Sequence, residues 1–267
     1  MGILNITPDS FSDGGRFFSI DAAVEQGRKL WQDGADILDL GAESTRPGAA
    51  DITLQEEMDR LLPVLEALQG EIPIPISVDT RKAAVMRAAH ALGVTLINDI
   101  SALSDDPDAL RTVAELGLDV CLMHKRGSPA TMQQNTQYEN VVLSVKEYLQ
   151  ERLAACVAAG LARDGILLDP GIGFAKDDPD NFQLLRRIRE LQSLGQPLLL
   201  GISRKGFLGR LTELADPGQR DLASHSAMLW VESQLGRAIY RVHDVAGARQ
   251  ALRIWNRLGE REERSNG

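Results

Sequence analysis

The 267-residue sequence has few cysteines, no long apolar run and no excess of positive charge. Its two cysteines, Cys121 and Cys156, lie in apolar surroundings, which favours buried free thiols over a disulfide or a metal site. Because no run of about 18 apolar residues occurs, we expect no membrane span. The net charge of −9 argues against nonspecific binding to nucleic acid. We therefore expect a soluble, cytoplasmic protein with neither membranes nor nucleic acids as partners.

Short apolar runs alternate with longer amphipathic segments along the chain, and no low-complexity stretch or long linker separates them. The runs are rich in Ile, Leu and Val, and they are continuous rather than alternating with polar residues. This pattern is typical of strands that are buried on both faces of a parallel sheet. The eight runs span residues 2–6, 36–41, 75–80, 95–100, 119–124, 165–171, 197–203 and 238–244.

The segments between the runs carry helix signals. Thr53 and Glu56 form a capping-box pattern. A helical stripe consists of Val141, Val145, Leu149, Leu153 and Cys156. Eight strand–helix units of about 33 residues fit one (β/α)8 TIM barrel of the α/β class. The alternative is a doubly wound open sheet, but no Gly-x-Gly-x-x-Gly follows the first run. We predict one domain over residues 1–267, with a polar tail from about residue 256 to 267.

Polar residues stand at the end of every apolar run. Barrel enzymes build their sites from the carboxyl ends of the strands and the loops that follow. One polar residue there is commonly a helix cap, whereas mixed polar groups at all eight ends predict a site. The end residues are Asn5, Asp79, Asn98, His124, Asp169, Ser203, Lys205, Arg241 and His243, with the stretch "GAESTRPGA" after the second run.

These residues fall into groups by their chemistry. Hydrogen-bonding side chains that could surround a flat heterocycle are Asp79, Asn98, Asp169 and Lys205. A cationic group suited to phosphate consists of Arg46, Arg241 and His243. Oxygen donors that could hold or lie near Mg²⁺ are Asn5 and Asp13. Walls for an aromatic-sized slot are Phe11, Pro47 and Phe174. Each residue also has a structural interpretation: Asp79 could cap a helix, Phe174 could be core, and His124 could satisfy a backbone group.

Seven motifs together resemble dihydropteroate synthase over nearly the whole chain, from residue 2 to about residue 255. In order they are "GILNITPDSFSDGG", "GAESTRPGA", "SVDTRK", "LINDISAL", "DPGIGFAK", "GISRKGFLGRL" and "RVHDV". The resemblance implies a (β/α)8 barrel, usually a homodimer. It also implies condensation of 6-hydroxymethyl-7,8-dihydropterin pyrophosphate with p-aminobenzoate to give 7,8-dihydropteroate and pyrophosphate. Sulfonamides compete for the p-aminobenzoate slot in that family, so this chain is an expected sulfonamide target.

The resemblance also implies residue roles. Pterin-binding positions are Asp79, Asn98, Met123, Asp169, Lys205 and Arg241. Pyrophosphate-binding positions are Asn5, Thr45, Arg46, Arg241 and His243, with Mg²⁺ as the cofactor and Asn5 as its ligand. The p-aminobenzoate slot is Phe11, Ser44, Pro47, Phe174, Ser203 and Lys205. Catalytic positions are Asp13, Asp79, Arg46 and Lys205, and Asp13 and Arg46 lie on the first and second strand–helix loops, which are mobile in the family.

A dissociative, SN1-like substitution is the expected chemistry, because pyrophosphate leaves readily once its charge is neutralised. Two other functions remain: a pterin-dependent methyltransferase, and a paralogue that binds pterin without catalysis. The motifs "ESTRPGA", "SRKGF" and "RVHDV" argue against the methyltransferase, which has no use for a pyrophosphate-binding cluster. A non-catalytic paralogue would be expected to lose its loop residues, but all of them are present, namely Asn5, Asp13, Arg46 and His243. Two features stay unassigned. Glu43 has no predicted role in binding, and we expect it to orient its loop by a hydrogen bond. The segment "RDLASHSAML" (220–229) lacks a Gly-Ser pair that is common in the family.

Overall fold

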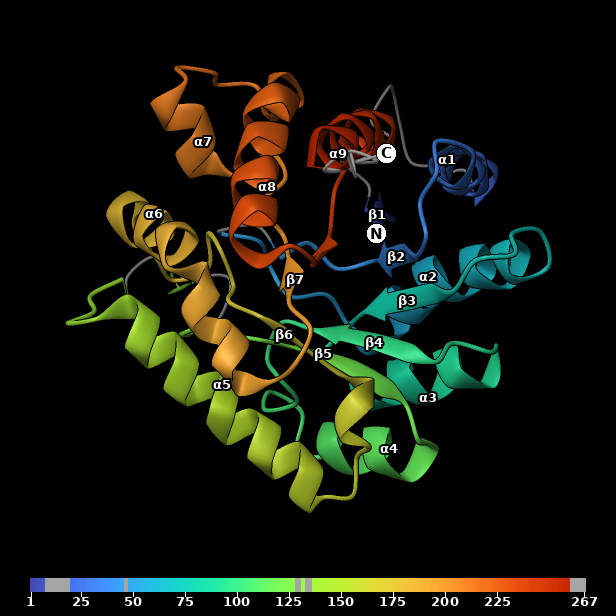
Figure 1. The fold of residues 1–267 in the computed structure, drawn as a ribbon. Helices are drawn as coiled ribbons and strands as arrows, with labels where there is room; N and C mark the ends of the chain where they lie inside the picture. Colours follow the sequence, from blue (N-terminus) through green and yellow to red (C-terminus); the bar gives the residue numbers. More distant parts are fainter. Residues whose placement is uncertain (8–19, 46–47, 128–130, 133–135, 260–267) are drawn as a thin grey trace, which may run out of the picture.

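The computed structural model describes residues 1–7, 20–45, 48–127, 131–132 and 136–259. Helices surround a set of parallel strands, as Figure 1 shows. Six strands pair in sequence order in one sheet, and two more pair with each other. The six are β1 (Gly2–Asn5), β2 (Leu38–Gly41), β3 (Ile76–Asp79), β4 (Leu96–Asp99), β5 (Asp119–Met123) and β6 (Ile166–Asp169), and the two are β7 (Leu199–Leu200) and β8 (Ile239–Tyr240).

Two backbone bridges join these sheets into a closed barrel. Leu168 bridges to Leu198, which connects β6 to the segment of β7. Gly2 bridges to Val242, and the Ile3 amide donates to the Val242 carbonyl at 2.9 Å, which connects the end of β8 to β1. Every strand pair is parallel. The prediction of a (β/α)8 barrel is therefore confirmed, and the open doubly wound sheet is excluded.

At least one α-helix follows each strand. The helices are α1 (Ile20–Gln32), α2 (Leu54–Gln69), α3 (Ala83–Ala91), α4 (Ala109–Leu116), α5 (Val141–Ala158), α6 (Asp178–Arg186), α7 (Gly206–Leu211), α8 (Asp221–Leu235) and α9 (Val245–Gly259). Two of them, α7 and α8, follow β7. Thr53 caps α2 by accepting from the Glu56 amide at 3.2 Å, as its sequence pattern predicts. The predicted apolar stripe of α5 is buried. None of the described helices is long and apolar enough to cross a membrane.

The end of α9 differs from the sequence prediction. The helix continues to Gly259, so it includes residues 256–259 of the stretch that was predicted as a polar tail. Residues 260–267 of that stretch lie outside the described part of the chain. The exposed end of a surface helix is polar like a tail, and composition alone does not separate the two.

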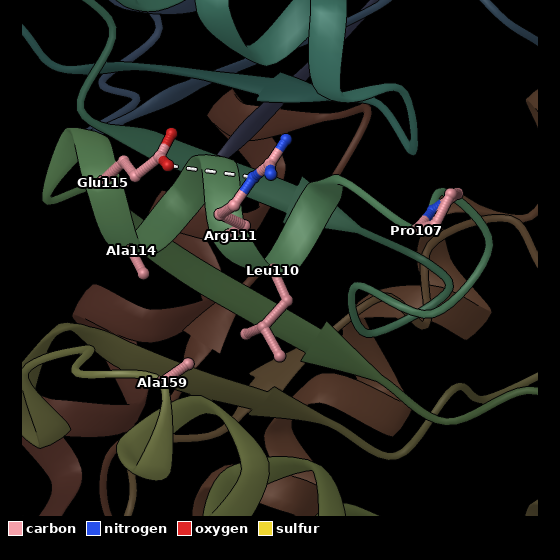
Figure 2. A pocket seen from close by; sticks show the side chains of 6 residues that line it. All are labelled: Pro107, Leu110, Arg111, Ala114, Glu115 and Ala159. Atoms are coloured by element: carbon pink, nitrogen blue, oxygen red, sulfur yellow. Dashed lines mark ion pairs between the residues drawn. The ribbon is translucent and has the colours of Figure 1, made fainter.

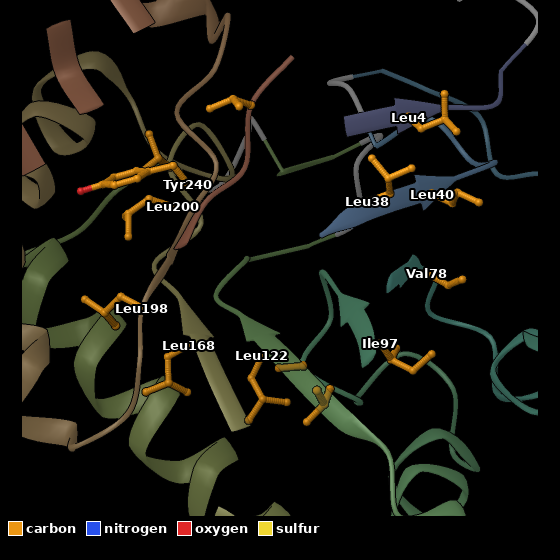
Figure 3. Packing of buried hydrophobic residues seen from close by; sticks show 14 of the residues in the cluster. Leu4, Leu38, Leu40, Val78, Ile97, Leu122, Leu168, Leu198, Leu200 and Tyr240 are labelled. Atoms are coloured by element: carbon orange, nitrogen blue, oxygen red, sulfur yellow. The ribbon is translucent and has the colours of Figure 1, made fainter. Parts of the chain in front are cut away.

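The barrel has apolar packing on both sides of its strands. Outward side chains such as Leu38 and Leu40 pack beneath the helices in the main core, part of which Figure 3 shows. A separate buried cluster contains Met1, Leu96, Cys121 and Leu199. Because successive strand residues point to opposite faces, this second cluster fills the barrel interior. Both cysteines are buried and free, which confirms the expectation from the sequence.

A surface pocket of about 480 Å³ lies on the outside of the barrel, between α4 and the end of α5 (Figure 2). Arg111 and Glu115 form an ion pair of 3.8 Å along one side of it. The lining residues are Pro107, Leu110, Arg111, Ala114, Glu115 and Ala159. None of the predicted site residues is among them, so the chemistry must be sought at the carboxyl ends of the strands.

Candidate active site

The carboxyl ends of the strands bring together most of the predicted pterin-binding residues. Asp79, Asn98 and Asp169 end β3, β4 and β6, or stand next to the end. Arg241 follows β8 directly and donates from Nη2 to Asp79 Oδ2 at 3.0 Å. Lys205 precedes α7. Asn98 and Asp169 are buried at 4% and 5% exposure, so these groups line the interior of the barrel mouth rather than capping surface helices.

One buried carboxylate, Asp39, binds several of these side chains, although the sequence patterns did not predict it as a site residue. Asp39 in β2 is fully buried and accepts hydrogen bonds from Ser77 Oγ, Asn98 Nδ2 (3.1 Å) and Arg241 Nε. Its neighbours Leu38 and Leu40 point outward, so Asp39 points into the barrel. The signal in the sequence was a charged residue inside an otherwise apolar run. Asp39 thus fixes side chains from three other strand segments.

Burial shifts the pKa values of the charged groups in the barrel mouth. Burial raises the pKa of Asp79, against the opposing effect of Arg241. It also raises the pKa of Asp169, against a hydrogen bond from the Gly171 amide and the charge of Lys205. Burial lowers the pKa of Lys205 to about 8, although Asp169 works in the other direction. Carboxylates and cations therefore lie close together in a poorly solvated place, as is common at functional sites.

The predicted aromatic slot adjoins this polar group. The Lys205 ammonium lies 4.3 Å from the centroid of the Phe174 ring, a cation–π contact. Phe174 and Met123 belong to one buried cluster, together with Ile100, Met132 and Ala175. Lys205 therefore stands between the two predicted subsites. Met123 and Phe174 form an apolar wall on one side of it.

The loop that carries Phe174 is built around a buried lysine. Lys176 is 2% exposed, and its ammonium donates to the carbonyls of Gly171 (3.0 Å) and Phe174 (2.9 Å). It also contacts His124 Nδ1 at 2.9 Å. Burial and the charge of Lys176 lower the pKa of His124 to about 2, so the imidazole is neutral and accepts through Nδ1. His124 thus has a structural role in supporting this loop.

His243 differs from the sequence prediction of a cationic phosphate group. Burial, and then the charges of Arg204 and Arg241, lower its pKa to about 3, so the imidazole is neutral at physiological pH. Ser203 Oγ accepts from the His243 amide (3.1 Å) and lies 2.9 Å from Nδ1. Because the Ser203 hydroxyl can both donate and accept, the direction of its bond to Nδ1 follows the tautomer of the neutral ring. A neutral His243 brings no positive charge to an anion at the barrel mouth.

Other predicted residues lie at the first two strand ends or in loops. Asn5 ends β1 and pairs in register with Gly41 of β2. Ser44 and Thr45 follow β2 and are partly buried. The remaining predicted site residues lie outside the described part of the chain, namely Phe11, Asp13, Arg46 and Pro47.

In the described part of the chain, few side chains could hold Mg²⁺. Among the described residues, no three His, Cys, Asp or Glu side chains gather in a way that could hold a metal ion. Asn5 offers one neutral oxygen at the end of β1. Mg²⁺ commonly keeps several waters and binds through substrate phosphates with only one or two protein ligands. The carboxamide oxygen of Asn5 therefore fits an ion that is also held by substrate phosphates and water, while Asp13, the other predicted oxygen donor, lies outside the described part of the chain.

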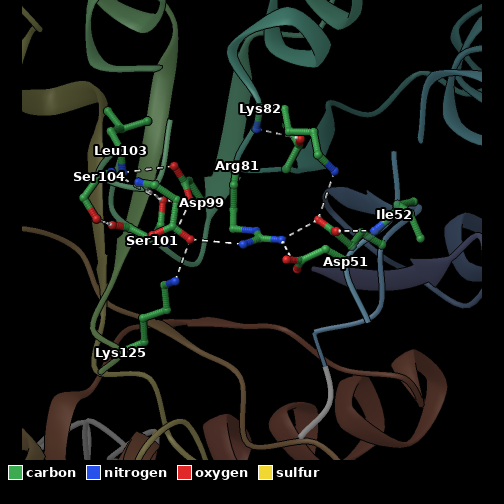
Figure 4. Close-up of polar contacts among 12 residues, drawn as sticks. Asp51, Ile52, Arg81, Lys82, Asp99, Ser101, Leu103, Ser104 and Lys125 are labelled. Carbon is green, nitrogen blue, oxygen red and sulfur yellow. Dashed lines mark hydrogen bonds and ion pairs between the residues drawn. The ribbon is translucent and has the colours of Figure 1, made fainter. Parts of the chain in front are cut away.

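Glu43 connects the loop after β2 to the next strand ends. Its Oε1 accepts from the Ile52 amide at 3.1 Å, which confirms the expected hydrogen bond across its own loop. Its Oε2 pairs with Arg81 (2.9 Å) and Lys82 (3.4 Å). Arg81 also pairs with Asp51 and reaches towards Lys125 through Asp105 (Figure 4). The network thereby joins the loops that follow β2, β3, β4 and β5.

Replacing Glu43 with glutamine is expected to lower the free energy of unfolding by about 1–3 kcal/mol, because two cations lose a partner that is 5% exposed. Urea unfolding monitored by circular dichroism measures the change. Asp51→Asn is the matched control, since Asp51 pairs with the same Arg81 but is 70% exposed. Its expected effect is about 0–1 kcal/mol. Equal losses in the two variants would show that Glu43 has no special role in the network.

Comparisons with known proteins agree with this geometry. A family model described as "Pterin binding enzyme" matches residues 1–243. Dihydropteroate synthase of Haemophilus influenzae is 46% identical over 255 residues, which cover 96% of this chain and 92% of that protein. The Xanthomonas albilineans enzyme of the same name, solved with 4-aminobenzoic acid, has a TM-score of 0.92 and 45% identity, covering 97% of this chain and 92% of that one. The Yersinia pestis enzyme, solved with a sulfonamide drug complex, has a TM-score of 0.91 and 43% identity, covering 97% and 93%. The chain belongs to the family of pterin binding enzymes.

Proposed function

We propose that the chain is a dihydropteroate synthase. It would join 6-hydroxymethyl-7,8-dihydropterin pyrophosphate to p-aminobenzoate, giving 7,8-dihydropteroate and pyrophosphate. The observation that carries this proposal is the position of Lys205, which lies against Phe174 on one side and among buried acidic groups on the other. The relative solved with 4-aminobenzoic acid supports an aromatic amine as one substrate.

In this proposal, the buried polar groups bind the pterin edge. Asp169 and Asp79 accept hydrogen bonds from ring and amino N–H groups, and Asn98 and Lys205 donate to ring acceptors. Arg241 stays fixed by its contacts with Asp39 and Asp79, so it presents a pre-oriented surface to the ring.

The substitution would proceed by departure of pyrophosphate before attack. The bond between the methylene carbon and oxygen breaks, and the pyrophosphate keeps the electron pair. The positive charge that remains is delocalised into the pterin and stabilised by the carboxylate of Asp79. The amine nitrogen of p-aminobenzoate then forms the new carbon–nitrogen bond and loses a proton. His243 would contact the departing anion. Arg46 would bind the pyrophosphate and Asp13 would stabilise the cation, as the resemblance of their motifs implies.

We further propose that Mg²⁺ is required and is held by Asn5 together with substrate phosphates. The ion would supply charge neutralisation for the departing pyrophosphate. Thr45 and His243 would orient the remaining phosphate oxygens. Because the described protein donors are few, the requirement for Mg²⁺ should depend on the presence of the pyrophosphate substrate.

Turnover with both substrates tests the proposed function. We expect the purified protein to release pyrophosphate and form dihydropteroate only when both substrates and Mg²⁺ are present, as followed by a coupled pyrophosphate assay and chromatography. Loss of activity with EDTA and its recovery with MgCl₂ is the expected control. A folded protein that binds pterin without releasing pyrophosphate would instead indicate a non-catalytic paralogue. Methyl transfer from methyltetrahydrofolate would indicate the methyltransferase.

Three further properties accompany the proposal. Sulfonamides should inhibit by competing with p-aminobenzoate, and a relative has been solved with a sulfonamide drug complex.

The protein should form a homodimer through its last helices. In the described residues, six of the ten exposed large apolar side chains lie on α7, α8 and α9, which is more than a monomer surface requires. The acidic net charge supports a cytoplasmic location.

A further inference from the structure

Arg204 separates two predicted site residues and has an unusual backbone conformation. Ser203 and Lys205 on either side of it lie in the barrel mouth, the first against His243 and the second against Phe174. The φ angle of Arg204 is +58°, in the left-handed region. This conformation costs a non-glycine residue about 1–2 kcal/mol, so contacts elsewhere must stabilise it.

Those contacts come from the start of α8. The Arg204 amide donates to Ser224 Oγ at 2.8 Å, and the Arg204 carbonyl accepts from Arg220 Nη1 at 3.1 Å. The guanidinium donates from Nε and Nη2 to the two oxygens of Asp221, at 2.7 Å each. Both backbone polar groups and the side chain of Arg204 are thus bound to one helical turn. This turn lies in "RDLASHSAML", the segment that the predicted site left unassigned.

The Arg204–Asp221 pair is stronger than an ordinary surface ion pair. Its geometry is bidentate, which fixes the plane of the guanidinium as well as its distance. Its side chains are only 30% and 26% exposed. Removing the carboxylate would therefore free the Arg204 side chain and leave only its backbone contacts with Ser224 and Arg220 to hold this turn.

Lys205 has little room to move without losing its contacts. A Cβ atom on Gly173 would lie 3.0 Å from Lys205 Cδ, so the lysine stem packs directly on the backbone of the loop after β6. Its ammonium lies over the Phe174 ring and near Asp169. A change in the path of the chain at Arg204 would shift this stem and the hydroxyl of Ser203 together.

We propose that Asp221 is a positioning residue for both substrates, acting through Arg204 on Lys205 and Ser203. This inference rests on the proposed function, because it assigns the consequence of the contact to the pterin and p-aminobenzoate subsites. Asp221 itself does not touch the reacting groups. Its carboxylate sets the path of the chain between two residues that do.

The test compares Asp221→Ala, Asp221→Asn and Asp221→Glu with the wild-type protein. We expect Asp221→Ala to raise the KM for p-aminobenzoate and the Kd for 6-hydroxymethylpterin about tenfold or more, with a smaller change in kcat, because misplaced binding groups weaken substrate positioning. Asp221→Asn should fall between Ala and wild type. Asp221→Glu can still accept from both guanidinium nitrogens and should restore most of the affinity.

The matched control is Glu71→Gln. Glu71 accepts from Nε and Nη2 of Arg28 in the same bidentate manner, and this pair is somewhat more exposed, at 39% and 38%. Glu71 lies before β3, at the opposite end of the barrel. We expect this change to alter Tm without altering either binding constant. Unchanged KM and Kd in folded Asp221→Ala or Asp221→Asn would overturn the proposal, as would equal changes in the Glu71→Gln control. A wild-type protein without turnover would instead overturn the proposed function.

Discussion

Replacing Lys205 with alanine is expected to weaken pterin binding by about ten- to a hundredfold. A hydrogen bond from a charged group contributes about 1.5–3 kcal/mol, and each 1.4 kcal/mol is a factor of about ten in affinity. Burial near Asp169 and Asp79 makes the lysine hard to replace by water. Isothermal titration calorimetry with 6-hydroxymethylpterin measures the change.

The same substitution should also raise the KM for p-aminobenzoate, since the contact with Phe174 is lost. Lys29→Ala is the control, because Lys29 is 60% exposed on α1 and pairs only along its helix with Asp33. We expect Lys29→Ala to leave the Kd for pterin and the KM for p-aminobenzoate unchanged within experimental error. If Lys205→Ala left the pterin affinity unchanged, Lys205 would have no part in pterin recognition, and its place between the two subsites would have to be reconsidered.

Replacing Asp39 with alanine is expected to lower the free energy of unfolding by about 3–5 kcal/mol. Such losses are typical when one partner of a buried ion pair is removed and the other stays behind. Arg241 would keep only Asp79, and Ser77 and Asn98 would lose their acceptor. Urea unfolding measures the loss, and calorimetry on the folded fraction should show weaker pterin binding as well.

Two variants separate the causes of this effect. Asp39→Asn keeps the shape and one acceptor oxygen, so it should lose less stability than Asp39→Ala. Asp36→Ala, three residues earlier, removes a carboxylate that is 73% exposed and pairs with Arg249. That control is expected to cost about 0–1 kcal/mol. A comparable loss in Asp36→Ala and Asp39→Ala would contradict the assignment of Asp39 as the organising carboxylate.

The sequence predicted the barrel and the residues at its mouth because both follow from one regularity. Strands that are buried on both faces are continuous apolar runs, and parallel strands end at one face. Asp79, Asn98 and Asp169 therefore came together as expected. Asp39 was missed because it lies inside a run, where only the direction of its side chain separates a barrel interior from a helix-covered exterior.

Charge states could not be predicted in the same way. His243 was predicted to be cationic because nothing in the neighbouring sequence indicates a neutral imidazole. Its neutrality depends on burial and on Arg204 and Arg241, which only the folded chain places beside it. Likewise, the three acceptors of Lys176 come from two separate loops. Such effects depend on three-dimensional surroundings, and a motif records only residue types.

The loop around Lys176 also determines how the aromatic slot can evolve. Lys176 binds the carbonyl oxygen of Phe174 and leaves the ring to the neighbouring apolar cluster and Lys205. Burial lowers the pKa of Lys176 to about 7, and in its ammonium form the three protons match the three acceptors around it. The conformation of the backbone therefore does not depend on which side chain stands at position 174. If the proposed function holds, a mutation at position 174 can change the shape of the proposed p-aminobenzoate slot while Lys176 still binds the backbone of the loop that forms it.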